Sequence, residues 1–361
     1  MTSMLSASRP LRMLLFVLAL ALGWSQGQAA PVKPPPPTPT MPRLWESLLW
    51  GVGMPIKTLG PGSTCPALAA LDRQLLLAEL FEGGIYLSEL DPATASARWT
   101  VPVAPAATGV ERTEVRAAAS GQTVWVAWLE KASGAGPETP RALMMASVDY
   151  ATRKAQPPTQ VAVTGAAALT SHNQQLWLAW LGPAGSSVIS LSAGAQDTAF
   201  LVPWQPATPA PPVAVGLGDL GADLGIPFLT GEGQGSSSLW LASYNGHRFF
   251  GLRKLRGAAE LGAPVLCRLQ SQVIIVYTVY PDPGEGLPGA AHLEVTVTNT
   301  SGSELASNLY LADGRANLTP SLAGLDGTAY LVYNAWSERP DHAVKPAKNL
   351  GLFLARIGPP S

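Results

Sequence analysis

An aromatic ring recurs at one aligned position of this chain, each time directly after a short apolar run. Five of the six aligned residues are aromatic and one is an acid: Glu79, Trp128, Trp180, Phe228, Tyr277 and Tyr333. Aromatic rings stack on sugars and other flat apolar ligands, so a collar of rings at one face predicts a ligand-binding surface. The alternative is that the rings fill the space between neighbouring sheets, where large apolar side chains usually lie.

Three long segments follow some of these rings and hold a good share of the charged residues: 130–142, 279–291 and 334–350. Binding residues concentrate on such connections, because a rigid scaffold holds them at the surface. Solvation of an exposed loop is the alternative, and residues 111–114 (ERTE) are expected at the same face. We predict a ligand site there, formed by Trp128, Trp180, Tyr277, Tyr280, Tyr333, Trp336, Arg339 and His342.

Acidic side chains in the same regions offer a second chemistry. If they converged, four of them could act as acid and base or bind Ca²⁺: Glu79, Glu130, Asp282 and Glu338. Histidine adds little, since the four histidines at 172, 247, 292 and 342 form no i,i+4 pair and no HExxH motif. We therefore predict no catalytic residue, no metal ligand and no cofactor, and keep an enzyme as the second reading.

The elements that must position these residues are short strands. From residue 63 onward, apolar runs alternate with Gly, Pro, Asn and Asp, which is typical of an all-β protein. One class of run, named strand b, recurs about every 50 residues and begins at residues 75, 124, 176, 224, 273 and 329. A proline at 227 makes the fourth copy the weakest. In the b strands, apolar residues occupy both the odd and the even positions, so both faces of each strand are apolar. This is expected for strands between two neighbouring sheets.

Each b strand has a strand on either side of it in the sequence. A strand rich in Ala and Gly, named strand a, precedes it at 65–72, 114–121, 165–172, 212–219, 263–270 and 319–326. Small residues suit an inner strand crowded around an axis. A strand c follows at 85–91, 143–149, 188–194, 239–245, 293–299 and 352–358, and five units add an outer strand d.

Six units of four strands resemble a six-bladed β-propeller over residues 44–361. The last unit lacks strand d, and the segment 54–59 (MPIKTL) is predicted to close the ring by supplying it. A seven-bladed ring and a pair of β-sandwiches are the alternatives. The resemblance is one of architecture: the sialidase Asp-box, the WD40, kelch and YVTN signatures are absent. No family's functional residues are carried over.

The N-terminus predicts export. Residues 1–29 combine Arg9 and Arg12 with a ten-residue apolar run and small residues before a cleavage point after Ala29, as in a secretory signal peptide. A retained anchor is the alternative, although ten helical residues span only about 15 Å of a bilayer core of about 30 Å. Residues 30–43 are a Pro-rich linker, extended in the polyproline II conformation. The mature chain is therefore expected outside the cytoplasm, without an integral membrane span.

Composition limits the partners. Lys and Arg number 23 against 24 Asp and Glu, and the net charge of −1 argues against nucleic acid, which needs a concentrated basic face. Two cysteines, Cys65 and Cys267, exclude a disulfide scaffold, and their places in units one and five predict that they are not bonded to each other. We expect a monomer that binds a carbohydrate or a protein without catalysis. The second reading is a hydrolase or lyase acting on a sugar or lactone, assisted by Ca²⁺.

Overall fold

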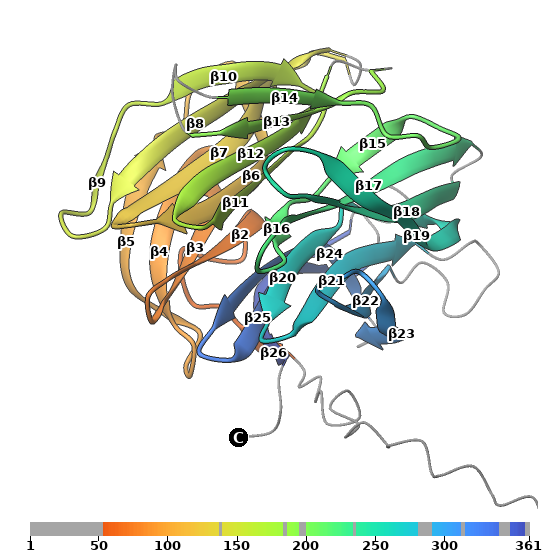
Figure 1. Ribbon diagram of the computed structural model, residues 1–361. Coiled ribbons are helices and arrows are strands. Elements are labelled where there is room, and N and C mark those ends of the chain that lie inside the picture. The colour runs from red at the N-terminus through yellow and green to blue at the C-terminus, as the bar shows by residue number, and fades with distance from the viewer. Residues whose placement is uncertain are drawn as a thin grey trace, which may run out of the picture. The chain divides into compact units, whose positions relative to one another are not determined.

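The computed structural model describes residues 53–136, 139–182, 186–194, 200–233, 236–280, 291–311, 315–338 and 347–357. Within these ranges the regular elements are all strands, in six four-stranded antiparallel blades arranged as a ring (Figure 1). The predicted six-bladed β-propeller is confirmed. The described residues contain no helix long and apolar enough to cross a membrane. The predicted signal peptide and Pro-rich linker lie outside the described residues and stay predictions.

Blades 1 to 3 each begin at the axis with strand a and end at the rim with strand d. Blade 1 consists of β2 (Thr64–Leu71), β3 (Gln74–Phe81), β4 (Gly84–Asp91) and β5 (Ser96–Ala104). Blade 2 consists of β6 (Val110–Ser120), β7 (Thr123–Ala132), β8 (Arg141–Asp149) and β10 (Thr159–Thr164), with the short β9 (Lys154–Ala155) also paired to β8. Blade 3 consists of β11 (Ala167–His172), β12 (Gln175–Leu181), β13 (Ile189–Ala193) and β14 (Phe200–Trp204).

Blades 4 to 6 complete the ring. In blade 4 the inner strand is divided into β15 (Pro212–Val215) and β16 (Gly218–Asp219), followed by β17 (Leu224–Gly233), β18 (Ser236–Tyr244) and β19 (Phe249–Leu261). Blade 5 consists of β20 (Val265–Leu269), β21 (Gln272–Tyr280), β22 (His292–Asn299) and β23 (Glu304–Leu311). Blade 6 consists of β24 (Ala316–Leu325), β25 (Thr328–Trp336), β26 (Asn349–Ile357) and β1 (Met54–Pro55).

The inner strand of blade 4 breaks opposite Pro227, at a point where blade 5 also comes close. Pro227 lies inside β17 and has no N–H to donate to the inner strand, although its carbonyl accepts a 2.7 Å hydrogen bond from the Gly216 N–H. A side chain at Gly216 would place Cβ 2.4 Å from the Pro264 carbonyl oxygen of blade 5. The proline that weakened the sequence prediction therefore splits strand a, while strand b remains intact.

The core is a set of six apolar layers, each between two adjacent blades. The described clusters lie at the junctions of blades 1 and 2, 2 and 3, 3 and 4, 4 and 5, 5 and 6, and 6 and 1. A b strand has a layer on each side, which explains why its apolar residues do not alternate with polar ones. Each blade therefore depends on both of its neighbours for burial.

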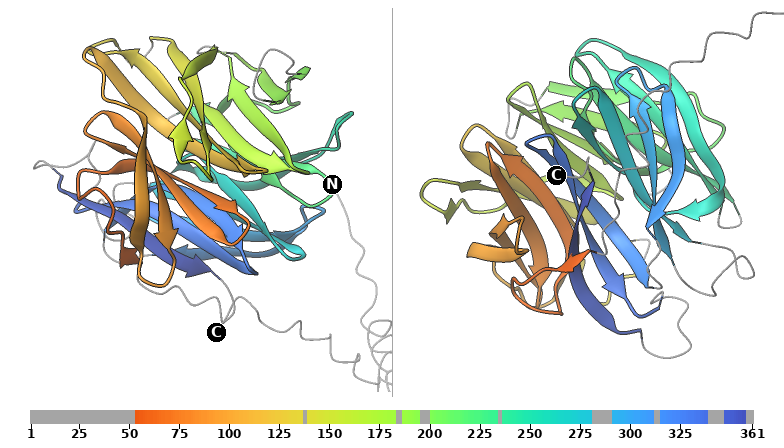
Figure 2. Two further views of the ribbon diagram at one scale, coloured as in Figure 1. Left: turned by 90° about the vertical axis from the view of Figure 1, so that its left-hand side faces the viewer. Right: turned by 90° about the horizontal axis from the view of Figure 1, so that it is seen from below.

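The ring is closed by the N-terminal segment, as predicted. β1 pairs antiparallel with β26 through Met54 and Pro55, and the Ile56 N–H donates to the Leu352 carbonyl oxygen at 2.8 Å. The ladder is shorter than expected, because Lys57 leaves it and bridges to blade 1. There its N–H donates to the Ala95 carbonyl oxygen at 2.9 Å. The first and last strands consequently lie side by side (Figure 2).

Two faces of the ring follow from this topology. The b–c face carries the connections from strand b to strand c, including 133–140, 281–291 and 337–348. The a–b face carries the turns from strand a to strand b. Several of these turns place a non-glycine residue at positive φ, such as Asp72 at 50° and Asp326 at 48°. Aspartate tolerates this conformation better than most residues, so short polar turns end the inner strands.

Candidate functional site

The inner strands enclose a cavity on the axis of the ring, called here the axial cavity. It has a volume of about 230 Å³ and is lined by strand a residues of all six blades. Most of the lining side chains are small or apolar, as the Ala- and Gly-rich pattern predicted. The charged residues among the lining are Arg116 of blade 2, Asp219 of blade 4 and Arg268 of blade 5. These three residues mark where a polar ligand can be recognised.

Crowding at the axis explains the small residues. A Cβ atom at Gly218 would lie 2.3 Å from a methyl group of Leu266 in the next blade. At Gly324 it would lie 3.0 Å from the Arg268 carbonyl oxygen. Larger side chains would push the inner strands apart, so a charged residue fits there only where it can extend along the axis.

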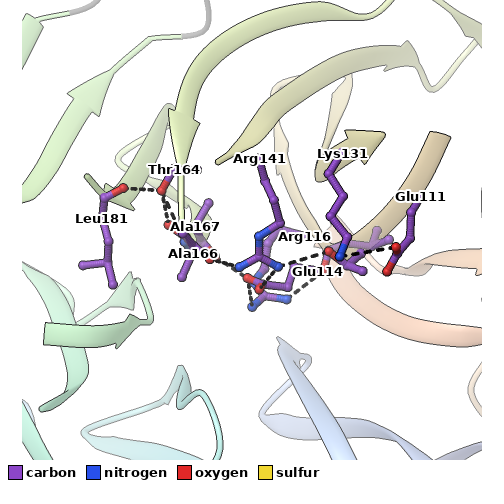
Figure 3. Close-up of polar contacts among 12 residues, drawn as sticks. Glu111, Glu114, Arg116, Lys131, Arg141, Thr164, Ala166, Ala167 and Leu181 are labelled. Carbon is purple, nitrogen blue, oxygen red and sulfur yellow. Dashed lines mark hydrogen bonds and ion pairs between the residues drawn. The ribbon is translucent and has the colours of Figure 1, made fainter. Parts of the chain in front are cut away.

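Arg116 anchors a charged cluster at the b–c end of the cavity (Figure 3). Its Nε donates to the Ala167 carbonyl oxygen of blade 3 at 2.9 Å, and its Nη1 donates to the Val115 carbonyl oxygen at 3.0 Å. Glu114 lies on the same strand. Its carboxylate forms ion pairs with Arg141 Nη1 at 2.9 Å and with Arg116 Nη2 at 3.8 Å. Blade 2 therefore presents two guanidinium groups around one carboxylate, tied to blade 3.

Arg141 is held from several sides. Besides Glu114, its Nη1 lies 3.3 Å from the Thr113 hydroxyl, and its Nη2 donates to the Gly165 carbonyl oxygen. Figure 3 shows Arg116, Glu114 and Arg141 together, with Lys131 and Glu111 beside them as a further ion pair of 3.4 Å. The side chains of the first three are 23%, 28% and 25% exposed, so they reach solvent while remaining fixed.

A second acid of blade 2, Glu130, is held by two hydrogen bonds. Glu130 Oε1 accepts from Arg112 Nε and from Trp128 Nε1, each at 2.8 Å. Arg112 Nη1 also donates to three carbonyl oxygens of blade 1 and its exit segment: Gly83, Ala104 and Pro105. The Arg112 side chain is only 7% exposed. This group joins blades 1 and 2 and leaves Glu130 little freedom to act as a base.

The opposite, a–b end of the cavity carries a different cluster. Asp219 Oδ1 is 2.8 Å from His172 Nδ1 of blade 3, and Asp219 Oδ2 is 3.4 Å from Arg268 Nε of blade 5. The other ring nitrogen of His172 lies 2.9 Å from Asn173 Nδ2. Three consecutive blades are thus connected through one carboxylate.

The predicted aromatic collar is largely inside the core. Trp128, Tyr277 and Tyr333 are fully buried, each packed against the preceding blade. Trp180 is half-buried and packs between blades 2 and 3. Burial, together with the nearby Glu294 carboxylate, raises the pKa of the Tyr277 phenol. This placement agrees with the packing alternative, and ligand contact by these rings stays a prediction.

The other predicted site residues are divided between the surface and undescribed chain. Tyr280 and Trp336 are half-buried at the ends of their b strands, where the b–c connections begin. Arg339 and His342 lie outside the described residues, as does Asp282. The structure therefore brings none of these three to a described site.

The remaining acids of the enzyme alternative, Glu79 and Glu338, differ in burial. Glu79 is fully buried, and its Oε2 accepts from the Thr58 hydroxyl of the closing segment at 3.0 Å. Burial raises the pKa of Glu79 above its ordinary value. Glu338 is exposed at the start of a b–c connection. Within the described ranges, no group of three or more His, Cys, Asp or Glu side chains could hold a metal ion.

Sequence reasoning did not single out the charged residues of the axis, and its placement of a ligand at the loop face stays a prediction. The signal was present in strand a, where Arg116, Asp219 and Arg268 interrupt an otherwise small and apolar pattern. A charge on an inner strand has a high desolvation cost, so it implies an ion pair or a ligand. The partner of each charged residue on strand a is decided by how the blades are arranged around the axis.

Comparison with known family models and with curated proteins gives no match. Among solved structures, the endosialidase of phage phi92 matches 85% of this chain and 69% of its own, with a TM-score of 0.62 and 7% identity. A protein of unknown function from Dyadobacter fermentans matches 85% of this chain and 98% of its own, with a TM-score of 0.60 and 10% identity.

A further similar structure is the Trypanosoma rangeli sialidase in complex with a difluorinated nononic acid. The match covers 85% of this chain and 57% of the sialidase, with a TM-score of 0.53 and 9% identity. At such low identities these matches establish the propeller fold alone.

Proposed function

We propose that this protein is a non-catalytic, extracytoplasmic binding propeller whose ligand binds at the b–c face, over the mouth of the axial cavity. The ligand is a carbohydrate or a polar segment of another protein. The extracytoplasmic location rests on the predicted signal peptide, and the ligand class rests on the polar groups at this mouth.

The observation that carries the proposal is the pairing of three acids of blade 2 at this face. Glu111, Glu114 and Glu130 are each within ion-pair distance of a Lys or Arg of blade 2. A general acid or nucleophile needs a carboxyl group that is free to exchange a proton or attack a substrate. Paired carboxylates and guanidinium groups in a fixed array instead supply acceptors and donors for the hydroxyl and amide groups of a ligand.

The mouth is also pre-organised. Arg116 and Arg141 are fixed by backbone carbonyl oxygens of blade 3, so little side-chain freedom is lost when a ligand binds. Tyr280 and Trp336, at the ends of their b strands, supply additional contact residues at this face. Their half-buried rings suit stacking on a sugar face.

The similar fold of the phage endosialidase and the trypanosomal sialidase supports a ligand with sugar character. It also keeps the enzyme reading as the competing function. That reading requires at least three of Glu79, Glu130, Asp282 and Glu338 to meet at one substrate. Of these, Glu79 is enclosed beneath the closing segment and Glu130 is paired with Arg112.

A glycan array probed with the purified mature protein tests the proposal, followed by calorimetry with the glycan that binds. We expect Arg116→Gln to weaken binding about tenfold, as for loss of a charged hydrogen bond. Arg253→Gln is the matched control: it removes the same charge from the rim strand β19, where Arg253 Nη1 contacts only the Gly302 carbonyl oxygen among the hydrogen bonds of the described chain.

Two results would contradict the proposal. One is turnover of the bound glycan by the wild-type protein that is lost in Glu79→Gln or Glu130→Gln. The other is a Ca²⁺-dependent rise in melting temperature that disappears in the same variants, since that would reveal a metal-assisted site.

A further inference from the structure

Arg268 is the most accessible charged group of the axial cavity and is held in place at the a–b end. Its side chain is 41% exposed, against 23% for Arg116 at the other end. Its Nε faces Asp219 Oδ2, and its Nη1 lies over the backbone of Gly221, where a Cβ atom would come within 2.6 Å. The guanidinium group of Arg268 therefore packs on the turn of blade 4. Gly221 is needed in this turn because its φ is +104°, which other residues rarely adopt.

The carboxylate that fixes Arg268 is already committed to other donors. Asp219 Oδ1 accepts from the Gly221 N–H and lies against His172 Nδ1, both at 2.8 Å. The side chain of His172 is 9% exposed, and Asn173 contacts its second nitrogen. The Asp219 carboxylate is thereby held by three groups, and the Arg268 atom paired with it is Nε, at 3.4 Å.

The Arg268 side chain belongs to the cavity lining and is 41% exposed, so its contacts with Asp219 and Gly221 do not enclose the guanidinium group. The neighbouring lining consists of hydroxyl-bearing and small neutral residues, including Thr170 and Ser171 of blade 3. Among the described lining residues, Asp219 is the sole carboxylate, and Arg116 at the far end adds a second positive charge. The cavity lining as a whole carries one net positive charge, although the whole chain carries −1.

We infer that the a–b end of the axial cavity is a binding site for the oxyanion of a small acid, with Arg268 as the residue that contacts it. A guanidinium fork matches a carboxylate or phosphate group with two parallel hydrogen bonds. The cavity of about 230 Å³ is smaller than the roughly 300–1,000 Å³ of sites for drug-sized ligands, so the ligand is a small molecule. This site lies beyond the proposed function, whose ligand binds at the b–c face.

Calorimetry of the full mature chain with acetate, succinate, inorganic phosphate and sulfate tests the inference, at an ionic strength kept constant with chloride. We expect saturable binding of at least one of these anions, weakened about tenfold or more by Arg268→Gln. Arg73→Gln is the matched control, because Arg73 is an exposed arginine at the same a–b face outside the cavity lining. It should bind as the wild type does.

The pattern among the probes identifies the source of the oxyanion. Tighter binding of succinate assigns the site to carboxylic acids, and tighter binding of phosphate assigns it to phosphorylated small molecules. Arg268→Lys keeps the charge without the fork, so it should retain part of the phosphate affinity and lose most of the succinate affinity.

Absence of saturable binding by the wild type overturns the inference, as does equal loss in Arg268→Gln and Arg73→Gln. If Arg268→Gln does not fold, the Nε–H resonance of Arg268 in the wild type, assigned with Arg268→Lys, provides the test: no shift on adding the anions also overturns it. Glycan binding at the b–c face is measured on the same samples, so failure of one site is distinguished from failure of the other.

Discussion

The seam between blades 6 and 1 and the junction of blades 3, 4 and 5 join neighbouring blades with different chemistry. At the seam, residues 53–59 connect β26 to blade 1 through backbone hydrogen bonds, above an apolar layer that includes Ile56. At the junction, His172, Asp219 and Arg268 meet through side chains at the edge of the axial cavity. Backbone pairing and apolar burial resist changes in pH and salt, whereas partly exposed ion pairs do not. The seam therefore supplies stability, and the junction positions charged groups.

Removal of the seam should have the largest effect. A chain that begins at Gly62 loses the bonds of Ile56 and Lys57, each contributing about 1 kcal/mol, and the partial burial of Ile56, worth less than the roughly 1.5–3 kcal/mol of a fully buried side chain. This is a large part of the roughly 5–15 kcal/mol that stabilises an ordinary domain. We expect this chain to be insoluble or to melt far below one that begins at Arg43. Melting temperatures within a few degrees of each other would show that the seam does not close the ring.

Disruption of the junction should cost less. Asp219→Ala removes the partner of a buried His172 nitrogen and releases Arg268, which we expect to lower the free energy of unfolding by about 1–3 kcal/mol. Asp219→Asn retains an acceptor of the same shape and should lose less. Urea denaturation of both variants measures the difference. Equal losses would mean that the charge of Asp219, and not its shape, holds the blades.

The pH dependence of the seam provides a smaller effect of defined sign. Burial raises the pKa of Glu79, so above the ordinary value of 4.5 the unfolded chain releases a proton that the folded chain keeps. Stability from this group consequently falls as the pH rises from 4.5 toward the raised pKa. We expect Glu79→Gln to flatten that decline in thermal melts taken across this range. A steeper decline in the variant would contradict burial as the cause.

Glu89, between blades 1 and 2, supplies a control, because its pKa is shifted in the opposite direction from that of Glu79. Burial alone would raise its pKa, but hydrogen bonds from Tyr150, Arg98 and Trp99 outweigh it and lower the pKa below 4.5. The folded chain therefore binds the proton less tightly than the unfolded chain, and this stabilisation is lost as the pH falls through the lowered pKa. Glu89→Gln should remove that acid-side loss and leave the decline assigned to Glu79 unchanged.

The smallest expected effect concerns the two free thiols. Cys65 is half-buried in blade 1 on the side of blade 2, and Cys267 is buried in blade 5 next to Arg268. Burial raises the pKa of Cys267 to about 12, so almost no thiolate forms at neutral pH. A disulfide-exchange reagent should label Cys65 before Cys267 in the native protein and both in denaturant without reductant. Equal native rates would show that Cys267 becomes accessible as readily as Cys65 in the folded protein.

Much of the fold could be predicted because a propeller repeats its pattern. The spacing of the b strands, the small residues of strand a and the missing strand d together indicated six blades and the place of closure. The length of β1 could not be predicted, since the bridge from Lys57 to blade 1 depends on where blade 1 lies in space. The division of the inner strand opposite Pro227 likewise depended on the close approach of blade 5 to Gly216.

The sequence by itself determined the architecture, because hydrophobic periodicity, turn residues and small inner strands are local properties that each unit carries. Only the tertiary structure decided the site. Trp128 and Tyr277 occupy aligned positions that suit either stacking on a ligand or packing between blades, and neighbouring blades enclose both. Arg116 and Arg268 each belong to one strand, but Arg116 also donates to the Ala167 carbonyl oxygen of blade 3 and Arg268 pairs with Asp219 of blade 4. Charge and burial at the axis are set by contacts between residues about 50 positions apart, which strand periodicity does not encode.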